Sequence, residues 1–150
     1  MDLVIFSAKY LFLLSIGLAL IMFVTSQHKK DLLKLSLLTF PLSFILAKLA
    51  SLIFYNPRPF VVENIQPLIP HGANNGFPSG HTLLAMTIAA VIFNFNKRLG
   101  LILMIVGLIV GISRVLVKVH HPVDILASTV IAFAVTSLAL YILRRFKNLP

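Results

Sequence analysis

Five apolar segments separated by short polar breaks take up most of this 150-residue chain. A helix needs about 20 residues to cross the hydrocarbon core of a bilayer, and most of these segments reach that length. A segment inside lipid must satisfy its own backbone hydrogen bonds, which favours helices. We therefore predict an all-α, polytopic transmembrane helical bundle that forms a single domain over residues 1–150. About five spans are expected, at residues 3–24, 35–55, 80–95, 99–117 and 123–143.

The basic residues are unevenly distributed between the two ends of such a bundle. The chain has 13 Lys and Arg against 4 Asp and Glu, which gives a formal net charge of +9. Parity of the spans places eight of them at one end: Lys29, Lys30, Lys34, Lys97, Arg98, Arg144, Arg145 and Lys147. The positive-inside rule makes this end cytoplasmic, with the N-terminus outside and the C-terminus cytoplasmic. The positive charge is thus explained without a nucleic-acid partner.

The other five basic residues lie at or near the opposite, extracytoplasmic end: Lys9, Lys48, Arg58, Arg114 and Lys118. The orientation rule leaves them unexplained. Arg58 and Arg114 are expected to face one point there, where planar guanidinium groups suit the oxygens of a phosphate. The alternative for each arginine alone is a side chain that extends to the membrane interface.

Residues 74–81 close the longest polar segment and open the third apolar one. Residues 74–76, Asn-Asn-Gly, are typical of turns, and Ser79 is a favoured helix N-cap. The free N–H groups and the dipole of a helix that starts at Gly80 would attract an anion. His81 adds a titratable ring beside them. The alternative is an ordinary capped helix with a surface histidine.

The third apolar segment is short. Sixteen residues, 80–95, reach about 24 Å as a helix, whereas the hydrocarbon core is about 30 Å thick. His81 is therefore expected slightly below the outer membrane surface, at the level of a lipid phosphate. A tilted bundle with local thinning of the bilayer is the alternative.

His120 and Asp124 are four residues apart across Pro122. Pro122 suits the first position of the last helix, which places Asp124 in its first turn. The carboxylate would then hold one ring nitrogen of His120 protonated and leave the other as a nucleophile. The alternative is that Asp124 only complements the helix dipole.

Histidines 71, 81, 120 and 121 share this face with Asp124 and raise the possibility of a metal site. Arg58 and Arg114 would repel a divalent cation from the same pocket. We therefore expect no metal and no cofactor.

Three motifs together resemble the signature of the type 2 phosphatidic acid phosphatase family, whose site also occurs in glucose-6-phosphatases and vanadium haloperoxidases. The matching residues are Arg58-Pro59, Pro78-Ser79-Gly80-His81, and Ser113-Arg114 with His120 and Asp124. The resemblance covers residues 48–124. One departure concerns the family lysine expected seven residues before Arg58, where Ser51 stands; Lys48 lies one turn earlier, as a substitute or as a structural lysine. Many members also have six spans.

The segment from Pro67 to His81 looks most like bacterial undecaprenyl diphosphate phosphatases of the bacitracin-resistance type. The resemblance implies metal-independent hydrolysis of a lipid (di)phosphate at the outer face of a bacterial plasma membrane. It implies His120 as nucleophile through a phosphohistidine, Asp124 as its orienting group and His81 as acid and base. The phosphate would be bound by Arg58, Arg114, Ser79, Gly80 and, as a substitute, Lys48.

The sequence leaves three alternatives open. The substrate could be phosphatidate or phosphatidylglycerol phosphate, since the head-group site would be the same. A non-hydrolytic lipid-phosphate binder would keep the arginines but would not need the spacing of His120 and Asp124. A vanadate-dependent peroxidase fits poorly, because those members are mostly soluble.

Overall fold

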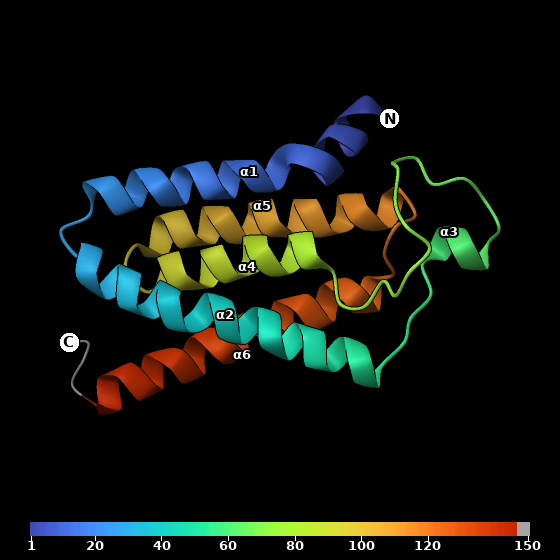
Figure 1. Ribbon diagram of the computed structural model, residues 1–150. Coiled ribbons are helices and arrows are strands. Elements are labelled where there is room, and N and C mark those ends of the chain that lie inside the picture. The colour runs from blue at the N-terminus through green and yellow to red at the C-terminus, as the bar shows by residue number, and fades with distance from the viewer. Residues whose placement is uncertain (147–150) are drawn as a thin grey trace.

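A computed structural model describes residues 1–146 as a bundle of helices that run back and forth between two ends (Figure 1). Lys147, one of the basic residues predicted at the cytoplasmic end, lies outside the described residues. The helices are α1 (Asp2–Thr25), α2 (Lys29–Ile53), α3 (Pro59–Val62), α4 (Gly80–Phe93), α5 (Lys97–Leu116) and α6 (Pro122–Arg145). The described residues contain no strand, and the all-α prediction is confirmed.

Four helices, α1, α2, α5 and α6, are long and apolar enough to cross a membrane. The fifth apolar helix, α4, has 14 residues and is therefore about 21 Å long. The expectation of about five spans with a short third one is confirmed. Many large apolar side chains on the four long helices point outward, as expected for surfaces that contact lipid.

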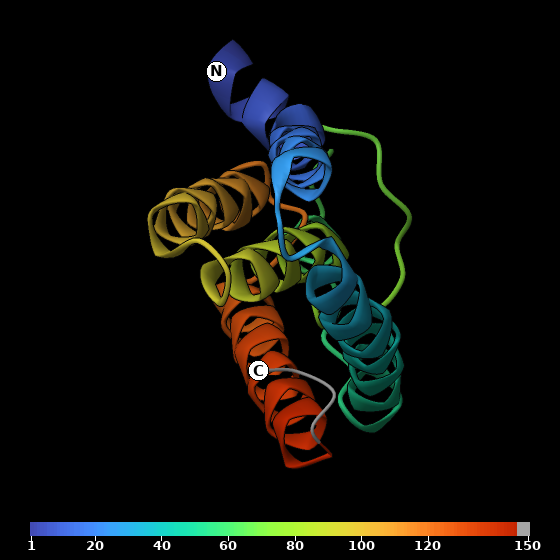
Figure 2. The same cartoon turned by 90° about the vertical axis from the view of Figure 1, so that its left-hand side faces the viewer.

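Helix α4 lies at the centre of the bundle. It contacts α1, α2, α5 and α6, and the view along the bundle shows these four helices around it (Figure 2). Ten of its 14 residues are buried, so its outward surface is small. Gly111 of α5 allows the close approach of its neighbours: a Cβ there would lie 2.5 Å from Ile125 Cγ2 and 3.4 Å from Thr82 Oγ1. The packing at Gly111 thereby brings the starts of α4 and α6 together.

The long connection between α2 and α4, the turn between α5 and α6, and the N-terminus lie at the same end of the bundle (Figure 1). The two short turns, residues 26–28 and 94–96, lie at the other end. This is the grouping that parity predicts. Which end faces the cytoplasm stays a prediction.

Two features differ from the expected spans. The second span was expected to start at residue 35, but α2 already begins at Lys29, since Lys and Leu favour helix and the first turn can extend into water. The polar segment at 56–78 contains the short helix α3, which starts at Pro59.

Candidate active site

His120 is positioned by the way α5 ends. The N–H of Lys118 donates to the Val115 carbonyl (2.9 Å) and the N–H of Val119 donates to the Arg114 carbonyl (3.2 Å). Together with a left-handed Lys118 (φ 63°), these bonds form a Schellman motif. Lys at this position carries a steric cost that Gly would avoid, and its ammonium pairs with Glu63 at 2.9 Å. The motif turns the chain back so that His120 points into the bundle end.

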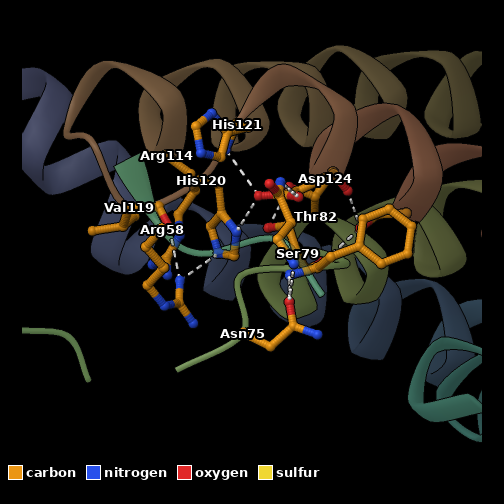
Figure 3. A network of polar contacts seen from close by, with 12 residues as sticks. Arg58, Asn75, Ser79, Thr82, Arg114, Val119, His120, His121 and Asp124 are labelled. Carbon is orange, nitrogen blue, oxygen red and sulfur yellow. Dashed lines mark hydrogen bonds and ion pairs between the residues drawn. The ribbon is translucent and has the colours of Figure 1, made fainter. Parts of the chain in front are cut away.

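Asp124 meets His120 from the start of α6. Pro122 is the first residue of the helix and Asp124 stands in its first turn, as predicted. The Nδ1 atom of His120 lies 3.2 Å from Oδ2 of Asp124 (Figure 3). The side chain of His120 is 3% exposed and that of Asp124 is 0% exposed, so this pair is shielded from water. The structure therefore brings together the two residues that their spacing predicts to pair.

Arg58 lies on the other side of the His120 ring. It is the N-cap of α3 and is buried. One terminal nitrogen, NH1, donates to the Val119 carbonyl (2.7 Å) and lies 3.4 Å from Nε2 of His120. Its Nε donates to Oδ1 of Asn74 (3.0 Å). Because an arginine only donates, Nε2 of His120 must be the unprotonated nitrogen and Nδ1 must carry the proton that Asp124 accepts.

The electrostatic setting favours a neutral His120. Burial is the main cause that lowers the pKa of His120; the hydrogen bond to Asp124 opposes it, and the charges of Arg114 and Arg58 add to the lowering. Burial likewise lowers the pKa of Arg58, and the Asp124 charge opposes this shift. A neutral imidazole with a free Nε2 lone pair is the form that can act as a nucleophile.

Arg114 approaches the site from the last turn of α5 and is 3% exposed. Its NH1 donates to the Ala8 carbonyl of α1 (3.1 Å) and its NH2 lies 2.6 Å from Nε2 of His71. Its Nε has no hydrogen-bond partner within the described residues. Both arginines therefore lie at this end of the bundle, but different partners hold them: Arg58 touches His120, whereas Arg114 is held by α1 and His71.

His71 has a contact that its sequence position does not predict. The structure places its ring 6.2 Å from that of His120, edge to face, and makes it the acceptor for Arg114. Burial, followed by the charges of Arg58 and Arg114, lowers the pKa of His71 to about 4. His71 is thus neutral at pH 7. His71 lies in a loop whose sequence has no helix or strand periodicity, so the sequence does not predict its contact with Arg114.

The residues 78–81 are fixed by α6. The Ser79 N–H donates to the Asp124 carbonyl (3.3 Å), and the Ser128 hydroxyl donates to the Ser79 carbonyl (2.9 Å). Ser79 is the N-cap of α4 as predicted, but its hydroxyl contacts Thr82 Oγ1 (3.1 Å) and not a backbone N–H. Gly80 is exposed, and a Cβ there would meet nothing within 4 Å.

His81 stands in the first turn of α4, half-buried. Its ring lies 4.7 Å from the ring of Phe12 on α1, edge to face. Within residues 1–146 its ring makes no hydrogen bond, so both nitrogens are available to a ligand.

Lys48 lies on α2 beside a polar groove. Lys48, Ser51, Asn74 and Gly80 line this groove together with apolar residues. Asn74 also accepts from Arg58, so the groove borders the site. Lys48 makes no ion pair with any described residue, and its role as a substitute for the family lysine stays a prediction.

Asn75, predicted only as part of a turn, is a structural residue that joins two segments. Its Nδ2 donates to the carbonyls of Ser51 (2.9 Å) and Phe54 (3.0 Å) at the end of α2. Its Oδ1 accepts from the N–H groups of Asn56 and Phe77, both at 3.0 Å. One side chain therefore joins the end of α2 to the loop before α4.

The described part of the chain contains no group of three His, Cys, Asp or Glu side chains arranged to hold a metal ion. His121, the fourth histidine, directs its Nε2 to the Pro57 carbonyl at 3.0 Å. Hydrolysis without a metal remains a prediction that activity measurements must test.

Comparison with known proteins identifies the arrangement. The family model described as PAP2 superfamily matches residues 10–148. The chain belongs to this superfamily. The resemblance inferred from the three motifs is thereby confirmed, and the PAP2 chain described here is a multi-pass membrane protein, in agreement with its helices.

Among curated proteins, the PAP2 chain is 37% identical over 118 residues to undecaprenyl-diphosphatase BcrC of Bacillus subtilis, covering 79% of this chain and 61% of that protein. It is 32% identical over 130 residues to bacitracin transport permease protein BcrC of Bacillus licheniformis, covering 85% and 64%. The chain thus spans about six-tenths of the length of these relatives. The crystal structure of Aquifex aeolicus LpxE matches with a TM-score of 0.77 at 26% identity, covering 93% of this chain and 86% of that one.

Proposed function

We propose that this PAP2 chain hydrolyses a lipid (di)phosphate without a metal, at the outer face of the membrane, and that its main substrate is undecaprenyl diphosphate, converted to undecaprenyl phosphate. The observation that carries the proposal is the buried line of Asp124, His120 and Arg58. Asp124 holds the proton of Nδ1 at 3.2 Å, and Arg58 stands 3.4 Å from the opposite nitrogen. A nucleophile with its orienting carboxylate on one side and a phosphate-binding donor on the other is suited to phosphoryl transfer.

The reaction would proceed in two displacements. Nε2 of His120 attacks phosphorus, the bond from phosphorus to the leaving oxygen breaks, and His81 donates a proton to that oxygen. The neutral His81 then takes a proton from water, whose oxygen attacks the phosphohistidine and releases inorganic phosphate. Arg58, Arg114, the Gly80 N–H and Lys48 would stabilise the charge on the equatorial oxygens.

An apolar groove supports a lipid substrate. It lies between α1, α2 and α4, and its lining includes Ile16, Leu84 and Ile88. Residues 81, 84 and 88 share one face of α4, and Phe12, one turn before Ile16, packs on the His81 ring. A hydrocarbon chain in this groove would leave its phosphate at His81.

The choice of undecaprenyl diphosphate is supported by the name of the 37% identical relative. A glycerolipid phosphate, phosphatidate or phosphatidylglycerol phosphate, is the enzymatic alternative, because the phosphate site would be unchanged. A non-hydrolytic lipid-phosphate binder is the alternative outside the enzymes.

The test is phosphate release by the purified protein in detergent with EDTA, compared for undecaprenyl diphosphate, phosphatidate and phosphatidylglycerol phosphate. We expect turnover of the prenyl diphosphate that His120→Ala abolishes and that His28→Ala, at the other end of the bundle, leaves intact. Preference for a glycerolipid would keep the chemistry and change the substrate. If the folded protein hydrolysed none of these lipids, the enzymatic proposal would be rejected and the non-hydrolytic lipid-phosphate binder would remain.

A further inference from the structure

Asp124 is a fully buried carboxylate that accepts three hydrogen bonds. Its Oδ2 accepts from the His121 N–H (2.8 Å) and faces Nδ1 of His120 (3.2 Å). Its Oδ1 accepts from Nδ2 of Asn56 (2.8 Å). No other described residue donates to Oδ1, so the Asn56 amide alone holds that oxygen.

Asn56 is itself held firmly. Its N–H donates to Oδ1 of Asn75 (3.0 Å), and its carbonyl accepts from the Gly76 N–H (2.9 Å). Gly76 is closely surrounded, because a Cβ there would lie 3.3 Å from both the Asn56 carbonyl oxygen and Asp124 Oδ2, so these neighbours would have to shift slightly. These backbone hydrogen bonds to the loop before α4 fix the position of Asn56, and its side-chain amide is thereby held against Asp124.

We propose that Asn56 is a positioning residue for the reaction: its donation to Oδ1 fixes the rotation of the Asp124 carboxylate, so that Oδ2 stays aligned with Nδ1 of His120 and keeps Nε2 unprotonated. This inference rests on the proposed function, in which His120 is the nucleophile. Without the amide, Oδ1 would be a buried acceptor with no partner, which is costly, and the carboxylate could turn away from His120.

The carboxylate of Asp124 beside Asn56 makes Asn56→Asp an informative substitution, because its effect should depend on pH. Asp124 contacts the Asn56 amide from α6, and it is bonded in turn to His120 and to the His121 N–H. Arg58 lies two residues along the chain at the start of α3. Arg114, His71 and His81 are the other titratable groups around His120. Asn56→Asp places a second carboxylate at hydrogen-bond distance from Asp124. Two such groups cannot both ionise at low cost, and a single shared proton restores the lost donor.

The experiment compares kcat of the full chain in detergent over pH for the wild type, Asn56→Asp and Asn56→Ala. We expect Asn56→Asp to lose about tenfold or more of kcat at pH 8, since the donor is absent. The ratio of its kcat to that of the wild type should rise toward one as pH falls and the shared proton binds. Asn56→Ala, which has no such proton, should be low by a ratio that does not vary with pH.

Asn96→Asp is the matched control. Asn96 caps α5 at the other end of the bundle by accepting from the Leu99 N–H (3.0 Å), and Asp serves equally well there. This variant should match the wild type at every pH. A pH-independent ratio for Asn56→Asp, or wild-type kcat in Asn56→Ala, would overturn the proposal.

A second readout does not depend on turnover, and it separates this proposal from the proposed function. Nitrogen-15 NMR of histidine-labelled protein reports the tautomer of His120, with the signal assigned through His120→Gln. We expect a single Nδ1–H tautomer in the wild type and a mixture in Asn56→Ala. If the tautomer of His120 is unchanged in Asn56→Ala, the role of Asn56 is wrong even if the protein hydrolyses lipid. If the tautomer changes but the wild type hydrolyses no lipid, the role of Asn56 stands and the proposed function is wrong.

Discussion

Arg58 covers the nitrogen of His120 that is predicted to attack phosphorus, with its NH1 3.4 Å from Nε2. This lone pair therefore faces a guanidinium group. A phosphate attacked by Nε2 would have to come between the two side chains, where it would accept from Arg58. In the proposed reaction, Arg58 would therefore be the donor that orients this phosphate.

This relationship predicts the effect of Arg58→Lys. Lysine keeps the charge, but a single ammonium cannot reach Asn74, Val119 and the phosphate together as the planar guanidinium does. We expect kcat/KM to fall on the order of 10²- to 10³-fold, the cost of removing one oxyanion donor. Arg98→Lys, a matched change in the first turn of α5, should have no effect. Activity close to wild type in Arg58→Lys would show that charge alone suffices.

Asp124→Asn should preserve the shape of the site but should no longer hold His120 in the tautomer with a protonated Nδ1. The amide can donate to Nδ1 of His120, which favours the tautomer with a protonated, non-nucleophilic Nε2. In a serine protease triad the equivalent change costs about 10⁴-fold in kcat, and we expect a loss of similar order. Asp31→Asn, at the other end of the bundle, is the control. Steady-state kinetics with unchanged thermal stability would separate this effect from unfolding.

A phosphohistidine should be trapped in the wild type. With substrate labelled on the terminal phosphate, an alkaline quench preserves the nitrogen–phosphorus bond. Label should stay with the wild-type protein, increase when hydrolysis of the intermediate is slowed in His81→Ala, and be absent in His120→Ala. Label bound in His120→Ala would assign the nucleophile to another residue.

The pH dependence should reflect the lowered pKa of His120, whose ordinary value is 6.5. The active form is neutral, so a lowered pKa keeps the nucleophile available at mildly acidic pH and activity is lost as pH falls through that lowered value. We expect the acid limb of kcat/KM to lie below pH 6.5. An acid limb above pH 6.5 in the profile measured from pH 4 to 9 would contradict this.

Gly80→Ala tests how closely the phosphate approaches α4. The added Cβ meets nothing within 4 Å, so folding should be unaffected. A phosphate seated on the first N–H groups would meet the methyl group, and we expect KM to rise roughly tenfold, equivalent to about 1.4 kcal/mol. Gly17→Ala, whose Cβ is also unobstructed, is the control on α1. Equal kinetics in both variants would place the phosphate elsewhere.

The orientation can be measured directly, because the chain has no cysteine. Gly72→Cys lies in the loop before α4 and Gln27→Cys in the turn between α1 and α2. A membrane-impermeant maleimide on intact cells should label Gly72→Cys and should label Gln27→Cys only after the cells are opened. The reverse pattern would place the site in the cytoplasm.

The sequence predicts contacts well where the chain itself enforces them. Pro122 starts a helix and the four-residue step from His120 to Asp124 spans one turn, so their pairing follows from local geometry. The link from Asn56 to Asp124 crosses 68 residues, and that from His71 to Arg114 crosses 43. Both depend on the path of a loop without periodicity, and no local rule fixes that path. The charged start of α2 was missed because a helix can extend beyond the membrane boundary that hydropathy detects.

The enclosure of α4 by four longer helices affects how the protein responds to changes in bilayer thickness and stiffness. When lipid chains lengthen, shorten or stiffen, the adjustment in tilt falls on α1, α2, α5 and α6, which meet the lipid. Helix α4 carries His81, and Ser79 at its start is hydrogen-bonded to Asp124 and Ser128 of α6. We therefore expect α4 to move together with the His120–Asp124 pair. The spacing of the two histidines should therefore be insulated from bilayer thickness, and catalysis should vary less with lipid composition than the tilt of the outer helices does.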